Sequence, residues 1–312
     1  MGGPVVSVIV PAYNAECFIL RSVSSALNQT LEEIEVIVVD DASTDGTVTV
    51  LNGINDPRLR VVSLEQNRGP GYCRNLAIKL SVGEWVAMLD ADDWFHHKRL
   101  QTLVEAAREW NADVVSDCHV IVDTKGVVLE PHVFAVYRKT IDEPVLLTAE
   151  GYISWVVLNQ PLIRRCFIDK RKILFPEDRR VGEDYWFALE CLLRGAKWVC
   201  MPQPYYYYSH RPFSLSHSGY VSIKRGIEVR QALLESDLTR ENHYVRHLLR
   251  MDILREKREF ALLLARDMFK PGHRLNALNE LFREPSLMLH LIVRIMLAVK
   301  RRLLRRGRSD SR

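Results

Sequence analysis

Short apolar runs alternate with helical patterns over the first third of the chain, and this alternation limits the available folds more than any other sequence feature. The runs are rich in Val and Ile and are each followed by a helical pattern. They are Val5–Val10, Glu35–Val39, Arg60–Leu64, Trp85–Leu89 and Asp113–Ser116. Strands that are apolar on both faces and separated by helices predict an α/β fold, a mostly parallel sheet flanked by helices.

The pattern changes after residue 115. Residues Val120–Leu129 predict a hairpin with a glycine turn, and helical patterns cover Ala149–Asn159 and Tyr185–Arg194. A strand at Trp198–Met201 leads into four consecutive tyrosines, and helical, Arg-rich sequence follows from residue 221. We therefore expect three parts, residues 1–115, 116–220 and 221–312.

The charge of the chain is concentrated at its C-terminal end. The formal net charge is +4, of which residues 294–312 contribute +7, so the remaining residues sum to −3. A slightly acidic body disfavours a nucleic-acid binder. The apolar stretch 287–299 is shorter than the roughly 20 residues of a membrane-spanning helix, and clustered Lys and Arg follow it. This end of the chain therefore predicts a helix lying on an anionic membrane surface, with a terminal helix packed on the body as the alternative.

The N-terminal region and the cysteines predict a cytoplasmic protein, peripheral on the inner face of the plasma membrane. The first strand begins at Val5 with no charged leader before it, so we expect no secretory signal. The six cysteines form no CxxC pair and no zinc-type cluster with His, which is typical of reduced thiols.

Acidic residues gather where the predicted parallel strands end. Asp40, Asp41 and Asp45 follow the second strand, and the segment Asp90–Asp93 follows the fourth. Because the carboxyl ends of parallel strands meet at one edge of a sheet, these side chains should converge. Crowded carboxylates raise each other's pKa and require a cation, and oxygen ligands suit Mg²⁺ or Mn²⁺. The alternative role for these residues is helix N-capping, which remains open for Asp45. A cap needs only one residue, whereas Asp90–Asp93 supplies three carboxylates, so capping does not explain that segment.

The chain lacks a glycine-rich phosphate loop. Neither GxxxxGK[ST] nor GxGxxG occurs, and Gly69-Pro70-Gly71 is too short to match either. P-loop NTPases and Rossmann dehydrogenases are therefore excluded. The charge of a bound diphosphate would be neutralised chiefly by a metal ion and by side chains.

Several motifs in order resemble the inverting glycosyltransferase family 2, which has the GT-A fold. They span about residues 5–215, and the ordered set is far more specific than any one motif. They are Val8–Asn14, Val38–Gly46, Asn67–Asn75, Gly83–Trp85, Leu89–Asp93 and Gly182–Phe187. More loosely, the chain resembles bacterial exopolysaccharide transferases of the succinoglycan type. The resemblance implies a nucleotide-sugar-binding half in residues 1–115, an acceptor-binding half in residues 116–220 and a helical, basic extension in residues 221–312.

The resemblance implies contacts with a UDP-sugar donor. Pro11, Tyr13 and Asp41 match positions that hold the uridine, with the tyrosine ring on the base and the aspartate accepting from its N–H. Arg74 matches an arginine near the diphosphate.

The resemblance also implies a metal site at the DxD motif. Asp90 and Asp92 match this motif, with Asp92 as the metal ligand, and Asp93 matches a position facing the donor sugar or metal. His210 matches a metal-binding histidine, and His217 is the alternative. The alternative for His210 is a surface histidine that binds no metal.

Asp184 matches the family's catalytic base. Attack by an acceptor hydroxyl requires a carboxylate to remove its proton, and the N-terminal end of a helix beginning there would keep Asp184 ionised. A simple N-cap is the alternative.

These features predict a metal-dependent inverting hexosyltransferase. It would move a hexose, with glucose expected, from a UDP-sugar to a hydroxyl of a saccharide acceptor linked to a polyprenyl lipid, in polysaccharide biosynthesis. A sugar-nucleotide pyrophosphorylase and an inactive nucleotide-sugar-binding protein are the alternatives, although the first needs a glycine-rich loop after the first strand.

Overall fold

The computed structural model describes residues 3–135, 140–155, 157, 160–210 and 220–268. The chain divides into two compact units, Met1–Ser214 and Leu215–Arg312. The expected halves 1–115 and 116–220 share a single sheet, and that division stays a prediction.

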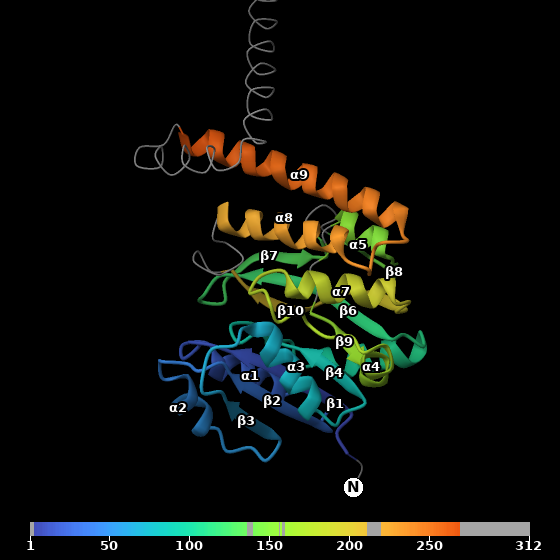
Figure 1. Ribbon diagram of the computed structural model, residues 1–312. Coiled ribbons are helices and arrows are strands. Elements are labelled where there is room, and N and C mark those ends of the chain that lie inside the picture. The colour runs from blue at the N-terminus through green and yellow to red at the C-terminus, as the bar shows by residue number, and fades with distance from the viewer. Residues whose placement is uncertain (1–2, 136–139, 156, 158–159, 211–219, 269–312) are drawn as a thin grey trace, which may run out of the picture. The chain divides into compact units, whose positions relative to one another are not determined.

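The N-terminal part of the first unit is a parallel sheet with the strand order β3-β2-β1-β4. Its strands are β1 (Val6–Ala12), β2 (Ile34–Asp40), β3 (Leu59–Ser63) and β4 (Trp85–Met88). The connecting helices are α1 (Ile19–Leu27), α2 (Thr47–Asn52) and α3 (Pro70–Leu80). The expected alternation of buried strands and helices is confirmed, because each β-branched run forms a strand of this sheet (Figure 1).

The same sheet continues beyond β4 with strands of both directions. From β4 the order runs β9-β6-β10-β5, with β7 added to β6 and β8 added to β10. The strands are β5 (Trp94–Phe95), β6 (Val114–Val122), β7 (Val128–Val133), β8 (Val145–Leu147), β9 (Leu162–Arg164) and β10 (Trp198–Ser209). The predicted hairpin is β6–β7, and the four tyrosines belong to β10 itself.

Four more helices belong to the first unit, and two helices are described in the second. The first four are α4 (Arg99–Glu109), α5 (Ala149–Trp155), α6 (Arg165–Arg171) and α7 (Glu183–Leu193). The second unit contains α8 (Tyr220–Glu235) and α9 (His243–Met268). These two helices are joined by the buried ion pair of Arg230 and Asp252, whose nitrogen and oxygen are 2.5 Å apart.

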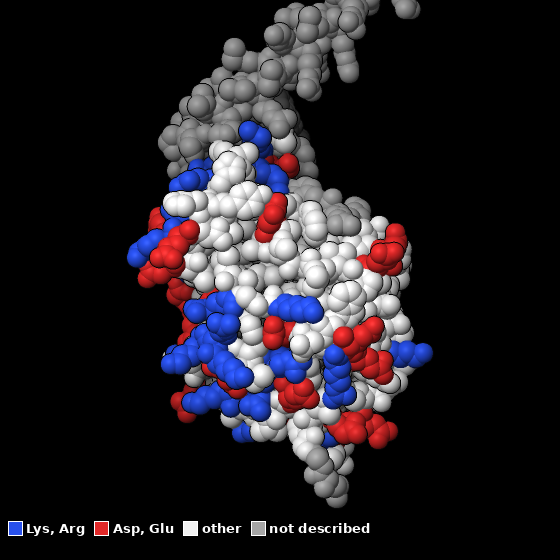
Figure 2. All heavy atoms as spheres, turned by 90° about the vertical axis from the view of Figure 1, so that its right-hand side faces the viewer, with Lys and Arg blue, Asp and Glu red and all other residues white. Residues whose placement is uncertain are grey.

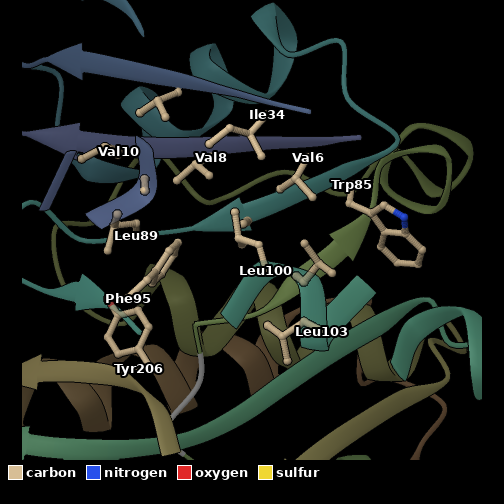
Figure 3. Close-up of a cluster of buried hydrophobic side chains, with 14 of the residues drawn as sticks. Val6, Val8, Val10, Ile34, Trp85, Leu89, Phe95, Leu100, Leu103 and Tyr206 are labelled. Carbon is tan, nitrogen blue, oxygen red and sulfur yellow. The ribbon is translucent and has the colours of Figure 1, made fainter. Parts of the chain in front are cut away.

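The side chains of β1 alternate between the two faces of the sheet, and both faces are buried in the core. Val6, Val8 and Val10 share one face of this strand and are fully buried in one cluster with Leu100 and Leu103 of α4 (Figure 3). The opposite face of the strand is buried as well, since Ile9 has no exposed surface. A strand buried on both faces must be apolar throughout, which explains the unbroken Val and Ile run.

A buried ion pair fastens α4 to the sheet. The Arg99 guanidinium donates to both carboxylate oxygens of Asp117, at 2.7–3.1 Å, and to the carbonyl of Gln160 at 2.5 Å. Both side chains of the pair are essentially unexposed. Removing one partner of such a pair typically costs about 3–5 kcal/mol. The pair therefore fixes the backbone at Gln160, which borders the candidate site.

Surface charge and helix hydropathy are the features that concern the expected membrane partner. Figure 2 shows one face of the molecule, where side chains of both signs lie side by side over its lower part. In the described part of the chain, no helix is both long and apolar enough to cross a membrane. The apolar stretch 287–299 and the basic residues after it lie outside the described residues.

Candidate active site

Loops after β1 and β2 form the first side of the site. Pro11 is the penultimate residue of β1, and Tyr13 follows the strand with half of its surface exposed. Asp41 is buried, and its carboxylate accepts hydrogen bonds from the backbone N–H groups of Arg68, at 2.6 Å, and Gly69, at 2.9 Å. Asp41 therefore holds the loop that leads into α3. Its expected contact with uracil stays a prediction.

Asp40 offers an acceptor that the sequence did not single out. One of its oxygens accepts from the backbone N–H of Ser43 at 3.2 Å. The other, Oδ1, is buried and has no hydrogen-bond partner among the residues that the structure describes. A buried acceptor is normally paired, so an unpaired oxygen is unusual at this position.

The capping alternative is wrong for Asp45 in its strict form, because Gly46 is the N-cap residue of α2 and Asp45 precedes it. Its Oδ1 accepts a hydrogen bond from the backbone N–H of Thr47, the first residue of α2, at 3.0 Å. Its Oδ2 accepts from the backbone N–H of Glu16 at 3.1 Å. Asp45 thus stabilises the start of α2 and the loop after β1.

The DxD residues have different surroundings. The two oxygens of Asp90 accept from Arg74 and from the Gln160 amide, each at 2.8 Å. Asp93 is 1% exposed, and its carboxylate accepts from the Tyr206 hydroxyl and the Ser209 N–H, both at 2.7 Å. Asp93 therefore ties this loop to β10.

Burial, together with the negative charges of Asp92 and Asp90, raises the pKa of Asp93 well above its ordinary value. Asp92 is half-buried. The predicted contact of Asp93 with the donor sugar or metal stays a prediction.

Arg74 of α3 forms two ion pairs within the site. Its guanidinium donates to Glu183 at 2.6 Å and to Asp90 at 2.8 Å, and the side chain is 8% exposed. Burial alone would lower the pKa of Arg74, but the charges of Asp90 and Glu183 raise it above its ordinary value. Arg74 therefore stays charged and joins the DxD loop to the start of α7.

Asp184 lines a small pocket. The pocket is lined by apolar Met88, Pro161, Phe175 and Phe187 and by polar Arg74, Gln160 and Asp184. Asp184 is exposed, yet the atoms around its carboxylate and the charge of Glu183 raise its pKa to about 6. A carboxylate with this pKa is ionised at neutral pH and is a stronger base than an ordinary aspartate.

The residues present fit a divalent cation bound jointly with a diphosphate. Among the described residues, no three His, Cys, Asp or Glu side chains converge as a metal site. Mg²⁺ is commonly held by one or two carboxylates together with substrate phosphates and water, and the crowded carboxylates beside Asp92 create the negative field that attracts it. Asp92 and His210 stay the predicted ligands, and His217 lies outside the described residues. The backbone N–H of His210 donates to the carbonyl of Val122 at 2.7 Å.

Two residues of the site were missed by sequence reasoning. Glu183 stands next to the predicted base, and its pairing with Arg74 was not expected, because 109 positions separate them. Gln160 sits in a segment without periodicity, so nothing in the sequence indicated its contact with Asp90.

Comparisons with known proteins identify the family. Residues 7–157 match the family described as Glycosyl transferase family 2. The chain is 30% identical to the succinoglycan biosynthesis protein ExoO of Rhizobium meliloti (strain 1021), over 96% of this chain and 87% of that protein. It is similar to S. aureus TarS in complex with UDP-GlcNAc, with a TM-score of 0.66, 27% identity, and coverage of 92% of this chain and 79% of that one.

A third similarity, to a mannosyltransferase from Pyrobaculum calidifontis solved with GDP-Man and Mn²⁺, has a TM-score of 0.61 at 20% identity and covers 97% and 86% of the two chains. At this identity it supports the fold alone. The chain belongs to glycosyltransferase family 2. The expected GT-A fold, glycosyltransferase class and likeness to exopolysaccharide transferases are thereby confirmed.

The pKa of Asp184 predicts the pH dependence of transfer. With Asp184 as the predicted base, protonation of its carboxylate below about pH 6 removes the proton acceptor, so kcat/KM should fall about tenfold per pH unit. Above about pH 7 this limb should be flat. The measurement is kcat/KM between pH 4.5 and 8. An acid limb centred near pH 4, the ordinary value for aspartate, would contradict the raised pKa.

Proposed function

We propose that this chain is an inverting, metal-dependent glycosyltransferase that moves a hexose, with glucose expected, from a UDP-sugar to a hydroxyl of a saccharide acceptor in polysaccharide biosynthesis. The observation that carries this proposal is the position of Asp184. Asp184 borders an apolar-walled pocket, and Arg74 joins its neighbour in the chain, Glu183, to Asp90 of the DxD loop. A base and a donor-binding loop are thus held in one connected site.

The relatives support the donor and the pathway. TarS, which was solved with UDP-GlcNAc, supports a UDP-sugar as the donor. ExoO, a protein of succinoglycan biosynthesis, supports a growing saccharide as the acceptor. Pro11, Tyr13 and Asp41 are proposed to hold the uridine.

The proposed reaction is a single displacement. The acceptor hydroxyl oxygen attacks the anomeric carbon on the side opposite to UDP, and Asp184 takes the hydroxyl proton as the new C–O bond forms. The bond from the anomeric carbon to the phosphate oxygen breaks, and UDP leaves with that electron pair. The configuration at the anomeric carbon is therefore inverted.

Charge on the leaving diphosphate must be neutralised. Mn²⁺ or Mg²⁺, held by Asp92 and His210, would supply Lewis-acid stabilisation of this charge. Arg74 supplies a fixed positive charge at the Asp90 side of the pocket. Asp93 keeps the DxD loop against β10 through Tyr206 and Ser209.

The acceptor is proposed to be presented at a membrane. Residues 287–306 combine an apolar stretch with clustered Lys and Arg, and each basic residue near an anionic surface contributes about 1 kcal/mol of attraction. We expect the full chain, but not a chain ending at Glu284, to sediment with anionic vesicles at low salt. If neither sediments, the peripheral-membrane proposal is wrong.

The catalytic role of Asp184 is tested by Asp184→Asn. We expect transfer to fall by about 10²–10⁴-fold, the usual contribution of general base catalysis, while UDP affinity is retained. The assay measures UDP released from a panel of UDP-sugars with Mn²⁺ and a membrane extract, and calorimetry measures UDP binding.

Three outcomes would count against the proposal. Loss of UDP binding in Asp184→Asn would make Asp184 a donor contact. UTP formation from UDP-sugar and pyrophosphate would favour a pyrophosphorylase. UDP binding by the wild type without release from any UDP-sugar would favour an inactive binding protein.

The metal proposal predicts that EDTA abolishes transfer and that Mn²⁺ or Mg²⁺ restores it. Asp92→Asn should lower transfer about 100-fold or more, because a bound cation supplies several kcal/mol of charge stabilisation. Asp169→Asn, an exposed aspartate on α6, is the matched control and should keep wild-type activity. Full activity in EDTA would refute the metal assignment.

A further inference from the structure

Asn75 of α3 holds the backbone of the segment Ile173–Glu177, here called the strap. Its Oδ1 accepts a hydrogen bond from the Phe175 N–H at 2.9 Å, and its Nδ2 donates to the Phe175 carbonyl at 2.9 Å. Nδ2 also donates to the Glu177 carboxylate at 2.9 Å. Two bonds to the N–H and C=O of one residue fix both its position and its direction. A side-chain amide carries a donor and an acceptor on two neighbouring atoms, and both are used here.

Gly71 lets the strap lie against α3. A Cβ at this position would be 2.3 Å from the carbonyl oxygen of Pro176 and 3.2 Å from its carbon. These are backbone atoms, so they could not move aside without moving the strap. The strap is thus in direct contact with the first turn of α3, and Asn75 fastens it one turn further along.

Phe175 connects the strap to α7. Its ring is buried and stacks on Phe187 of α7, with ring centroids 3.9 Å apart and an interplanar angle of 1°. The Arg74 guanidinium lies 5.3 Å from the centre of the same ring. Both phenylalanines line the pocket beside Asp184, which stands at the start of α7.

The N-terminal end of α3 is also attached to the loop after β2. The backbone N–H groups of Arg68 and Gly69, just before the helix, donate to the buried Asp41 carboxylate. α3 therefore connects the loop after β2 to the strap and, through Phe175 and Phe187, to the helix that carries Asp184.

We infer that Asn75 is a positioning residue that sets the place of Asp184 relative to the bound donor, through the strap and the Phe175–Phe187 stack. This inference rests on the proposed function. Asn75 touches neither donor nor acceptor in this role. Its loss should leave UDP binding intact and weaken only the transfer step, since a base displaced by about 1 Å can lose as much as 10²-fold in rate.

A double-mutant cycle tests the inference. The variants are Asn75→Ala, Asp184→Asn and the double variant, and Lys79→Ala is the control because Lys79 is an exposed residue of the same helix. For each, kcat and KM for UDP-glucose with Mn²⁺ and a membrane extract are measured, together with UDP affinity by calorimetry. If Asn75→Ala does not fold, the isosteric Asn75→Asp, which loses the donor atoms, takes its place.

Asn75→Ala should lower kcat about 10–100-fold and leave UDP affinity within about twofold, while Lys79→Ala changes neither. Added to Asp184→Asn, it should cause no further loss, because its effect passes through the base. If the two losses multiply, or if UDP affinity falls with kcat, the inference is overturned and the proposed function stands. If Asp184→Asn itself keeps full transfer, the proposed base is wrong and the inference falls with it.

Hydrogen exchange gives a second readout that does not depend on turnover. In Asn75→Ala the amide of Phe175 and the first turn of α7 should exchange faster than in the wild type and in Lys79→Ala. Unchanged exchange at both places would overturn the inference, because the strap would then be held without Asn75.

Discussion

The two ion pairs of Arg74 are the interaction on which the site depends. One guanidinium, 8% exposed, bridges Asp90 at the end of β4 and Glu183 at the start of α7. A buried charge is tolerated only when it is paired, and breaking such a pair typically costs about 3–5 kcal/mol. The DxD loop and the helix that carries Asp184 are therefore held by the same residue. Their relative position is set before any substrate binds.

Negative charge exceeds positive charge around this bridge, and the excess explains the titration of the site. Three carboxylates, of Asp90, Glu183 and Asp184, act on Arg74, and those of Asp92 and Asp93 extend the cluster beyond Asp90. Burial lowers the pKa of Arg21, a residue of α1, and the negative charges of Asp93 and Asp92 oppose this shift. Burial and this excess raise the pKa of Asp93 strongly and that of Asp184 to about 6. The same excess underlies the proposals that the site binds a divalent cation and that Asp184 is the base.

The sequence predicted what local patterns encode. The Val and Ile runs of β1 and β2 indicated a buried parallel sheet, and the end of β4 indicated where Asp90 and Asp92 would lie. The three-residue strand β9 was missed, because so short an element is defined by its antiparallel partners β4 and β6 rather than by its own residues. The partner of Arg74 was missed for the same reason, since Glu183 lies 109 positions away. Contacts of this range depend on the assembled sheet, and no local pattern contains them.

The stereochemistry of the product tests the central claim most directly, because a single displacement assisted by one carboxylate has only one stereochemical outcome. Proton NMR of the product, taken early in the reaction with UDP-glucose or whichever UDP-sugar turns over, reports the configuration at the transferred anomeric carbon. The account predicts a configuration opposite to that of the donor. A product with the donor's own configuration would contradict it, because Asp184 would then not be the base of an inverting transfer.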